Sequence, residues 1–224
     1  MSNKAVLCIG TILNLLVMSA PLVFVDILLL EYLCRPVTWV YYSLVAVFCF
    51  LESRDSLNLC DGNPVKTEKA FLPYLIGICV LIFFWIAIYD YANYFSLHLI
   101  QAVIGSLIVV MGVSLRLISI RKLNQYFLSH VALVDNHQLI TTGIYSFVRH
   151  PSELGLLTIC FGVAILLSSM TGLWFIALVL CPLTIYRISL EERLLRSLFT
   201  TEYEKYRTTT PRLLPEASFN HLFY

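Results

Sequence analysis

The stretch LGLLTICFGVAILLSSMTGLWFIALVLCPLTIY, residues 154–186, contains no Asp, Glu, Lys or Arg. A helix that crosses the hydrocarbon core of a bilayer needs roughly 20 apolar residues. The stretch is too long for one such helix and short for two. Turn-forming residues lie near its middle, in the segment SSMTG at 168–172. The sequence therefore predicts a tight hairpin of two short or tilted membrane helices.

The composition of the whole chain agrees with a membrane location. Hydrophobic residues make up 59% of the 224 residues, charged residues make up 13%, and the mean hydropathy is +0.82. A soluble domain usually carries roughly 25% charged residues, which cover its surface. Much of this surface must therefore face lipid. We predict an all-α fold, a polytopic transmembrane helical bundle.

Four more apolar segments precede the hairpin, at 5–30, 37–51, 71–89 and 97–119. Together with the hairpin they predict about five to six crossings, and the crossing at 37–51 is the shortest. Lys and Arg are concentrated in the segments that such an arrangement places on one side. Because cytoplasmic loops are enriched in these residues, we expect both termini and the long polar segments to be cytoplasmic.

The chain divides by composition into a transmembrane scaffold at 1–110, a polar-rich region at 111–215 and a tail at 216–224. Asp26 in the scaffold is either a functional intramembrane acid or a residue at the end of its span, near Glu31. The seven cysteines are odd in number and show no CxxC spacing. We expect them to be buried apolar side chains, with no metal site. A net charge of +1 gives no reason to expect nucleic acid as a partner.

Two polar segments flank the hairpin, at 116–155 and at 186–215. Both fall on the predicted cytoplasmic side, so they can form one pocket over the membrane. Pro151 suits the first turn of a helix, because it has no N–H group to leave without a partner there. The free N–H groups of that turn can be capped by Ser152 and Glu153, or they can bind a ligand anion.

Several charged residues at the membrane edge have two interpretations. Arg187 and Glu191 are four residues apart, which is typical of an ion pair along one helix, yet charges beside an apolar stretch usually have a specific partner. Arg116 is either a cation that reaches the headgroups or a carboxylate binder. Arg149 and His150 either mark the headgroup level or form part of a site.

Together these segments resemble the isoprenylcysteine carboxyl methyltransferase family, integral membrane enzymes that use S-adenosylmethionine. The resemblance covers about half of the chain, 111–215, and has four features in order. They are MGVSLR at 111–116, FLSHV at 127–131, HQLITTGIYSFVRHPSELG at 137–155, and Arg187 followed by Glu191, Glu192, Phe199, Tyr203, Tyr206, Pro211 and Pro215. The third is the most specific, since it resembles the family pattern H-T-L-(V/I)-T-x-G-x-Y-x-x-x-R-H-P-x-Y-x-G.

The resemblance implies roles for individual residues. Arg187 would neutralise the substrate carboxylate, and Arg116 is a weaker candidate for similar catalytic work. Glu153 stands where the family usually has a tyrosine. The implied contacts to S-adenosylmethionine are Leu133, His137, Gln138, Leu139, Ile140, Tyr145, His150, Pro151, Ser152, Glu153 and Glu191, with Leu133 limited to a backbone or apolar contact.

The resemblance predicts methyl transfer from S-adenosylmethionine to a carboxylate of a lipophilic acceptor, isoprenylcysteine-like or prenylated, within membrane lipid. A carboxylate is already ionised at pH 7, so the reaction needs no general base. The sequence leaves the identity of the acceptor and the oligomeric state open.

The sequence is compatible with three alternative functions. The first is a phospholipid or other amine N-methyltransferase of the same membrane type, in which His130, His150 or Glu153 would remove a proton from the acceptor. The second is a membrane sterol reductase, whose C-terminal region is similar but which usually has more spans. The third is a non-catalytic small membrane protein or a transporter. Transporters place polar groups at mid-membrane, whereas here these groups gather at one edge.

Overall fold

The computed structural model describes residues 35–59, 64–67, 71–94, 99–123, 132–134 and 139–213. Several sequence-based expectations lie outside these residues. They are the span at 5–30 with Asp26, the segment at 127–131 with His130, and the predicted contacts His137 and Gln138. Leu133 is described by its backbone alone.

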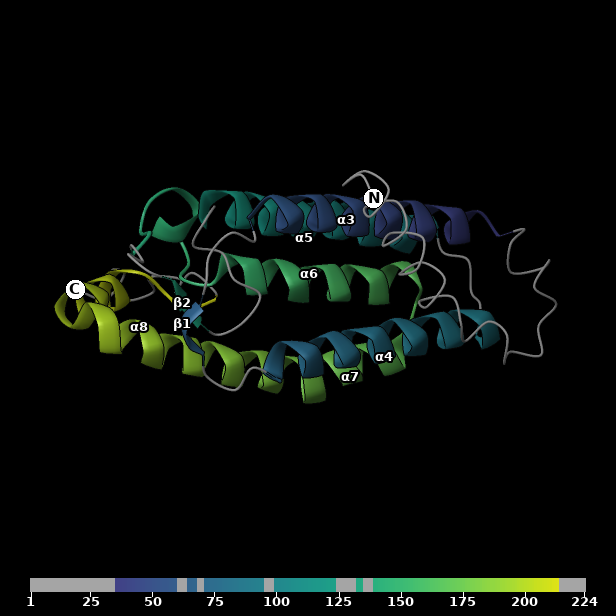
Figure 1. Cartoon of the computed structure of the whole chain (residues 1–224). Helices are drawn as coiled ribbons and strands as arrows, with labels where there is room; N and C mark the ends of the chain where they lie inside the picture. The colour runs from purple at the N-terminus through teal and green to yellow at the C-terminus, as the bar shows by residue number, and fades with distance from the viewer. Residues whose placement is uncertain are drawn as a thin grey trace, which may run out of the picture.

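The described residues form a bundle of long helices (Figure 1). The helices are α3 (Pro36–Leu59), α4 (Leu72–Asn93), α5 (Leu99–Leu123), α6 (Pro151–Leu166), α7 (Met170–Phe175), the π-helical segment η4 (Ile176–Leu180) and α8 (Cys181–Thr209). In Figure 1, α6 lies between α3 and α5 on one side and α4 and α7 on the other.

Short elements lie between the long helices. Strands β1 (Pro64–Thr67) and β2 (Ala132–Val134) pair antiparallel, with Lys66 opposite Leu133. The 3₁₀ helix η3 (Gly143–Ser146) precedes α6. The predicted all-helical class is confirmed, and the two-stranded ribbon of β1 and β2 is an addition to it that was not predicted from the sequence.

The helices have the length and composition of membrane spans. Three helical stretches are long and apolar enough to cross a bilayer: Leu72–Asn93, Leu99–Leu123 and Met170–Thr209. Large apolar side chains such as Leu107, Trp174 and Leu178 are exposed on their outer faces, where lipid would cover them. The chain is therefore an integral membrane protein. The number of crossings stays a prediction, because α6 has 16 residues and a length of only about 24 Å.

The hairpin predicted at 154–186 is present. Its turn lies at 167–169, where Ser168 has a φ of 54° and Ser169 caps α7 by accepting a hydrogen bond from Gly172 N. Asp90 of α4 accepts hydrogen bonds from Ser169 Oγ at 2.7 Å and from Thr171 N at 3.2 Å. The end of α4 is thereby joined to the turn of the hairpin.

Glycines let α5 and α6 approach closely. A Cβ atom added to Gly112 would lie 2.8 Å from Ile159 N and 2.9 Å from Gly155 O, and one added to Gly105 would lie 2.8 Å from Gly162 O. Small residues at such contacts allow membrane helices to pack backbone against backbone. The antiparallel pairs 105 with 162 and 112 with 155 fix the register of the two helices. The boundary expected at residue 110 falls within α5, and the division into regions stays a prediction.

This packing predicts different effects for two similar substitutions. A Cβ at Gly155 would lie 2.9 Å from Arg116 N, whereas a Cβ at Gly77 of α4 meets nothing within 4 Å. Both Gly→Ala changes raise helix propensity equally, so a difference in stability between the two variants reports the difference in packing. We expect Gly155→Ala to be about 1–3 kcal/mol less stable than Gly77→Ala, by thermal unfolding in detergent. Equal melting temperatures would contradict the close contact.

Candidate active site

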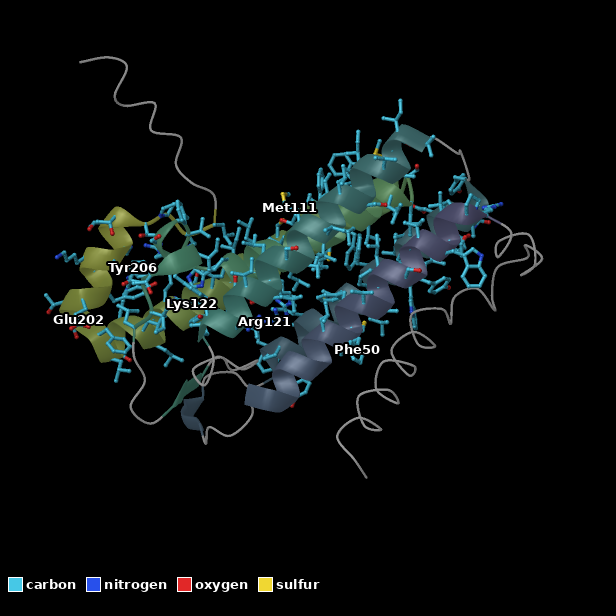
Figure 2. The ribbon with its side chains drawn as sticks, turned by 90° about the horizontal axis from the view of Figure 1, so that it is seen from above. Phe50, Met111, Arg121, Lys122, Glu202 and Tyr206 are labelled. Atoms are coloured by element: carbon cyan, nitrogen blue, oxygen red, sulfur yellow. The ribbon has the colours of Figure 1, made fainter. Side chains whose placement is uncertain are left out.

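Segments from both sides of the hairpin meet at one end of the bundle. Arg149 N donates to Pro211 O at 2.9 Å, and His150 N donates to Arg212 O at 3.2 Å. The chain that follows α8 therefore lies alongside the loop that precedes α6. Figure 2 shows Tyr206 and Glu202 of α8 at the same end as Lys122 of α5. This end of the molecule carries charged residues from α5, from the loop before α6 and from α8.

Glu192 is the centre of a buried ionic cluster at this end. Its side chain is 2% exposed, and its Oε1 lies 3.0 Å from Arg149 Nη2 and 3.4 Å from His150 Nε2. Arg212 binds the same carboxylate through two nitrogens, Nε at 3.2 Å and Nη2 at 2.5 Å. These hydrogen bonds raise the pKa of Arg212 above its ordinary value. A single carboxylate on α8 thus fixes the loop before α6 and the segment after α8.

Tyrosine hydroxyls fix the 3₁₀ helix η3 between α5 and α8. Tyr145 OH donates to Ser119 O at 3.3 Å, and Tyr206 OH donates to Tyr145 O at 2.5 Å. The Tyr203 ring packs edge-on against Tyr206, with centroids 6.2 Å apart. Burial raises the pKa of Tyr145, and the negative charge of Glu191 raises it further. Tyr145 therefore remains a protonated hydrogen-bond donor.

The first turn of α6 contacts two arginines from other helices. Arg187 Nη1 lies 2.6 Å from Glu153 Oε1, with side chains that are 11% and 6% exposed. Arg116 Nη1 donates to Ser152 Oγ at 3.2 Å and to Ser152 O at 3.3 Å. Arg187 thus pairs with Glu153 across the hairpin, whereas its spacing along the helix had suggested Glu191 as its partner. Arg116 binds the α6 turn rather than only reaching toward headgroups.

Glu191 differs from its neighbour Glu192. Its side chain is 39% exposed, and its Oε2 lies 3.8 Å from His150 Nδ1. His150 therefore lies between the two glutamates, with the buried Glu192 on one ring nitrogen and the more exposed Glu191 near the other. A ligand in this region can reach Glu191 without breaking the Glu192 cluster.

A cavity of about 510 Å³ opens beside this end of α8. Its volume is within the range of roughly 300–1,000 Å³ that is typical of small-molecule sites. Of the predicted cofactor contacts, Leu139 lines it. The other lining residues are Thr141, Ser146, Glu202, Lys205, Tyr206, Thr209 and Thr210. Tyr206 connects the cavity to η3, because its hydroxyl also binds Tyr145 O.

The structure connects most of the predicted site residues that it describes. Arg116, Tyr145, His150, Pro151, Ser152, Glu153, Arg187 and Glu191 lie on contacting segments at one end of the bundle. Leu139 and Ile140 are half-buried in the loop that leads to η3. The ligand roles assigned to all of these residues stay predictions.

The ionic partners within the site were not predicted from the sequence. Glu192 was noted only as part of a motif, Arg149 only beside His150, and Arg212 not at all. The pairing of Glu153 with Arg187 was also not foreseen. The pair of adjacent acids at 191–192 was the signal in the sequence that could have indicated a buried partner. Adjacent residues of a helix point in different directions, so at a membrane edge one of them can face the protein while the other faces outward.

The ionic cluster predicts a large effect at Glu192 and a small effect at an exposed glutamate. Glu192→Gln leaves Arg149 and Arg212 without their shared anion, and breaking a buried pair in this way typically destabilises by about 3–5 kcal/mol. Glu204→Gln is the matched control, because Glu204 is half-exposed and such surface pairs contribute about 0–1 kcal/mol. Thermal unfolding in detergent measures both. Similar melting temperatures for the two variants would show that the cluster does not hold the segments together.

Comparison with known proteins supports the resemblance found in the sequence. Residues 103–197 match the model of the isoprenylcysteine carboxyl methyltransferase (ICMT) family. The chain is 39% identical over 80 residues to the protein-S-isoprenylcysteine O-methyltransferase of Schizosaccharomyces pombe, covering 36% of this chain and 34% of that protein. It is 34% identical over 108 residues to the protein of the same name from Saccharomyces cerevisiae, covering 47% and 45%. The resemblance to this family is confirmed over residues 103–197.

The fold also matches a solved structure. The structure of the eukaryotic intramembrane Ras methyltransferase ICMT has a TM-score of 0.64 to this chain at 20% identity, covering 96% of this chain and 75% of the other. This likeness confirms the membrane fold. The sequence alignments span between about one third and one half of the length of the two yeast proteins.

Proposed function

On the premise that residues 103–197 carry the sequence pattern of the ICMT family, we propose that the chain is an S-adenosylmethionine-dependent methyltransferase. Its acceptor is the carboxylate of a lipophilic, isoprenylcysteine-like molecule or a prenylated protein. The observation that carries the proposal is the convergence of Arg187, His150 and Glu191 on the first turn of α6, at the edge of a charge-free hairpin.

The residues present fit S-adenosylmethionine. Glu191 has a partly exposed carboxylate beside His150, which would suit the amino group or ribose hydroxyls. Leu139 and Ile140 would offer apolar surface to the adenine, and Tyr145 fixes the 3₁₀ turn that follows them by donating to Ser119 O. Pro151 and Ser152 complete the proposed contacts in the first turn of α6. His137, Gln138 and Leu133 belong to the same proposal through the family pattern alone.

The proposed reaction depends on holding donor and acceptor in position and on excluding water, more than on acid–base chemistry. When bound, the cofactor would supply a methyl group on a sulfonium sulfur. The acceptor oxygen would form the new C–O bond, the electron pair of the broken C–S bond would stay on sulfur, and no proton would need to move. Arg187 orients the acceptor carboxylate through its rigid guanidinium fork. Arg116 holds the α6 turn in place through Ser152. Holding two reactants in line in this way can lower a barrier by roughly 7–11 kcal/mol.

We place this site on the cytoplasmic face. The helical stretch Met170–Thr209 has 40 residues, which is about 60 Å, so its second half extends beyond a hydrocarbon core of roughly 30 Å. Arg187 and Glu191 lie near the point where it would leave the membrane. Arg121, Lys122 and Arg149 lie at the same end, and this enrichment in basic residues favours the cytoplasm.

A second candidate acceptor is an amine headgroup. One observation favours it: Arg187, the proposed carboxylate binder, already pairs with Glu153, whose Oε2 has no hydrogen-bond partner among the described residues. A buried carboxylate oxygen of this kind suits an N–H donor and can accept a proton from an ammonium group.

Binding and product chemistry test the proposal. In detergent-solubilised protein, calorimetry with S-adenosylhomocysteine should show saturable binding, because this product occupies the cofactor site. With methyl-labelled S-adenosylmethionine, a farnesylcysteine analogue should become labelled and lose the label in base, as a methyl ester does. Base-stable label on phosphatidylethanolamine would instead establish the amine acceptor. Absence of binding by folded protein would exclude both.

Arg187→Lys tests the role of the guanidinium. Lysine keeps the positive charge beside Glu153 but has no planar fork for a carboxylate. We expect kcat/KM for the carboxylate acceptor to fall by about tenfold or more, the value of one hydrogen bond to a charged group. The dissociation constant of S-adenosylhomocysteine should remain within about twofold, a difference of about 0.4 kcal/mol. Unchanged turnover would remove Arg187 from acceptor binding.

A further inference from the structure

The far end of α8 packs against the rest of the molecule through few residues. Within residues 200–209, Tyr203 and Tyr206 are buried and the others are exposed. Earlier in the same helix, between 184 and 194, several side chains are buried. A segment with few buried contacts opens at a smaller free-energy cost than the core does. The far end of α8 is therefore the part of this helix that can separate most easily from its neighbours.

The helix is interrupted directly before this segment. Phe199 has a φ of −112° and a ψ of 33°, whereas a regular helical residue has about −63° and −42°. Neither proline nor glycine lies near this position in α8. Ser197 Oγ donates to Leu194 O at 2.8 Å, and a side chain that bonds the carbonyls of its own helix in this way often bends that helix. The interruption makes Phe199 a natural hinge for the residues that follow.

Polar contacts join the chain beyond Phe199 to the parts of the site around it. Tyr206 OH donates to Tyr145 O at 2.5 Å. Arg212 binds the buried Glu192 carboxylate through two nitrogens. Polar contacts of this kind can break and form again, because water satisfies the exposed groups while they are apart.

The contact between the far end of α8 and the loop before α6 is incomplete. The cavity of about 510 Å³ lies between them. Leu139, Thr141 and Ser146 line it from the loop, and residues between 202 and 210 line it from α8. The two surfaces are thus joined by a few contacts around a space, and they are not packed together throughout.

The predicted cofactor contacts next to this segment are closed off from solvent. Tyr145, His150, Ser152 and Glu153 are between 5% and 8% exposed. A closed site must open each time that a substrate enters and a product leaves. None of the predicted cofactor contacts lies within residues 200–213, so this segment can cover the site without binding the ligand itself.

We propose that residues 200–213 form a cover over the cofactor site, which turns about Phe199 to let the nucleotide in and out, with Arg212 as its latch. This inference rests on the proposed function, because it takes a nucleotide in the site as given. The latch can release without leaving Glu192 unpaired, since Arg149 Nη2 stays 3.0 Å from the carboxylate. Arg212 is thus a positioning residue that controls exchange of the cofactor.

Arg212→Gln tests the latch through the two rate constants of nucleotide exchange. Tritium-labelled S-adenosylhomocysteine is added to detergent-solubilised protein in a scintillation proximity assay, and excess unlabelled nucleotide then starts dissociation. Because the cover must open for both entry and exit, we expect both rate constants to rise together, by about fivefold or more. Solvent limits this effect, because the Arg212 side chain is 38% exposed. The dissociation constant should stay within about twofold, because the cover does not bind the nucleotide.

Two more variants accompany this measurement. Arg207→Gln is the matched control: it removes the same charge from the same segment, but the Arg207 side chain is 45% exposed and pairs with the exposed Glu204. Its rate constants should stay within about twofold of the wild-type values. Tyr206→Phe removes the hydroxyl that binds Tyr145 O and keeps the ring. Like Arg212→Gln, it should raise both rate constants in parallel.

The outcomes separate the cover from the proposed function. Absence of nucleotide binding by folded wild-type protein would overturn the proposed function. Faster dissociation with unchanged association in Arg212→Gln and Tyr206→Phe would show that the segment binds the nucleotide and does not gate it. Unchanged rate constants in both variants, or an equal increase in Arg207→Gln, would also overturn the cover and leave the proposed function intact. Tyr206→Phe decides the matter if Arg212→Gln fails to fold.

Discussion

The buried Glu192 carboxylate is the interaction on which the arrangement of this end of the molecule depends. A charge with 2% of its side chain exposed requires cations close by, and Arg149 and Arg212 supply them from the loop before α6 and the segment after α8. His150 lies against the same oxygen that Arg149 contacts. Three parts of the chain that are distant in sequence must therefore meet at one point. The proposed cofactor and acceptor contacts lie on these same parts.

The membrane half supplies the second constraint. Because glycines bring α5 and α6 into backbone contact, Arg116 of α5 is placed against the first turn of α6, where it binds Ser152. The hairpin then returns α8 to that turn, so that Arg187 meets Glu153. The tight helix packing sets the positions of the arginines, and the ionic cluster sets those of the loops. The site lies where the two constraints meet, at the edge of the apolar region.

The sequence predicted the features that follow from composition and local pattern. The absence of charge over 154–186 identified the hairpin. Its turn at 167–169 overlaps the predicted turn segment 168–172 only at Ser168 and Ser169, because the rest of that segment begins α7. Side-chain partners were harder to predict. Spacing along one helix suggested Glu191 for Arg187, but the hairpin brings Glu153 to it from 34 residues away. The family pattern could not predict the contact between Glu153 and Arg187, because Glu153 departs from that pattern. Helical periodicity could not predict it either, because the two residues lie on different helices.

Hydrogen–deuterium exchange with and without S-adenosylhomocysteine would locate the bound ligand on the chain rather than only detect it. We expect slower exchange on binding in residues 139–154 and around Glu191, with no change in the middle of α4. Protection confined to other parts of the chain, in protein that binds the nucleotide, would contradict a site built from these segments.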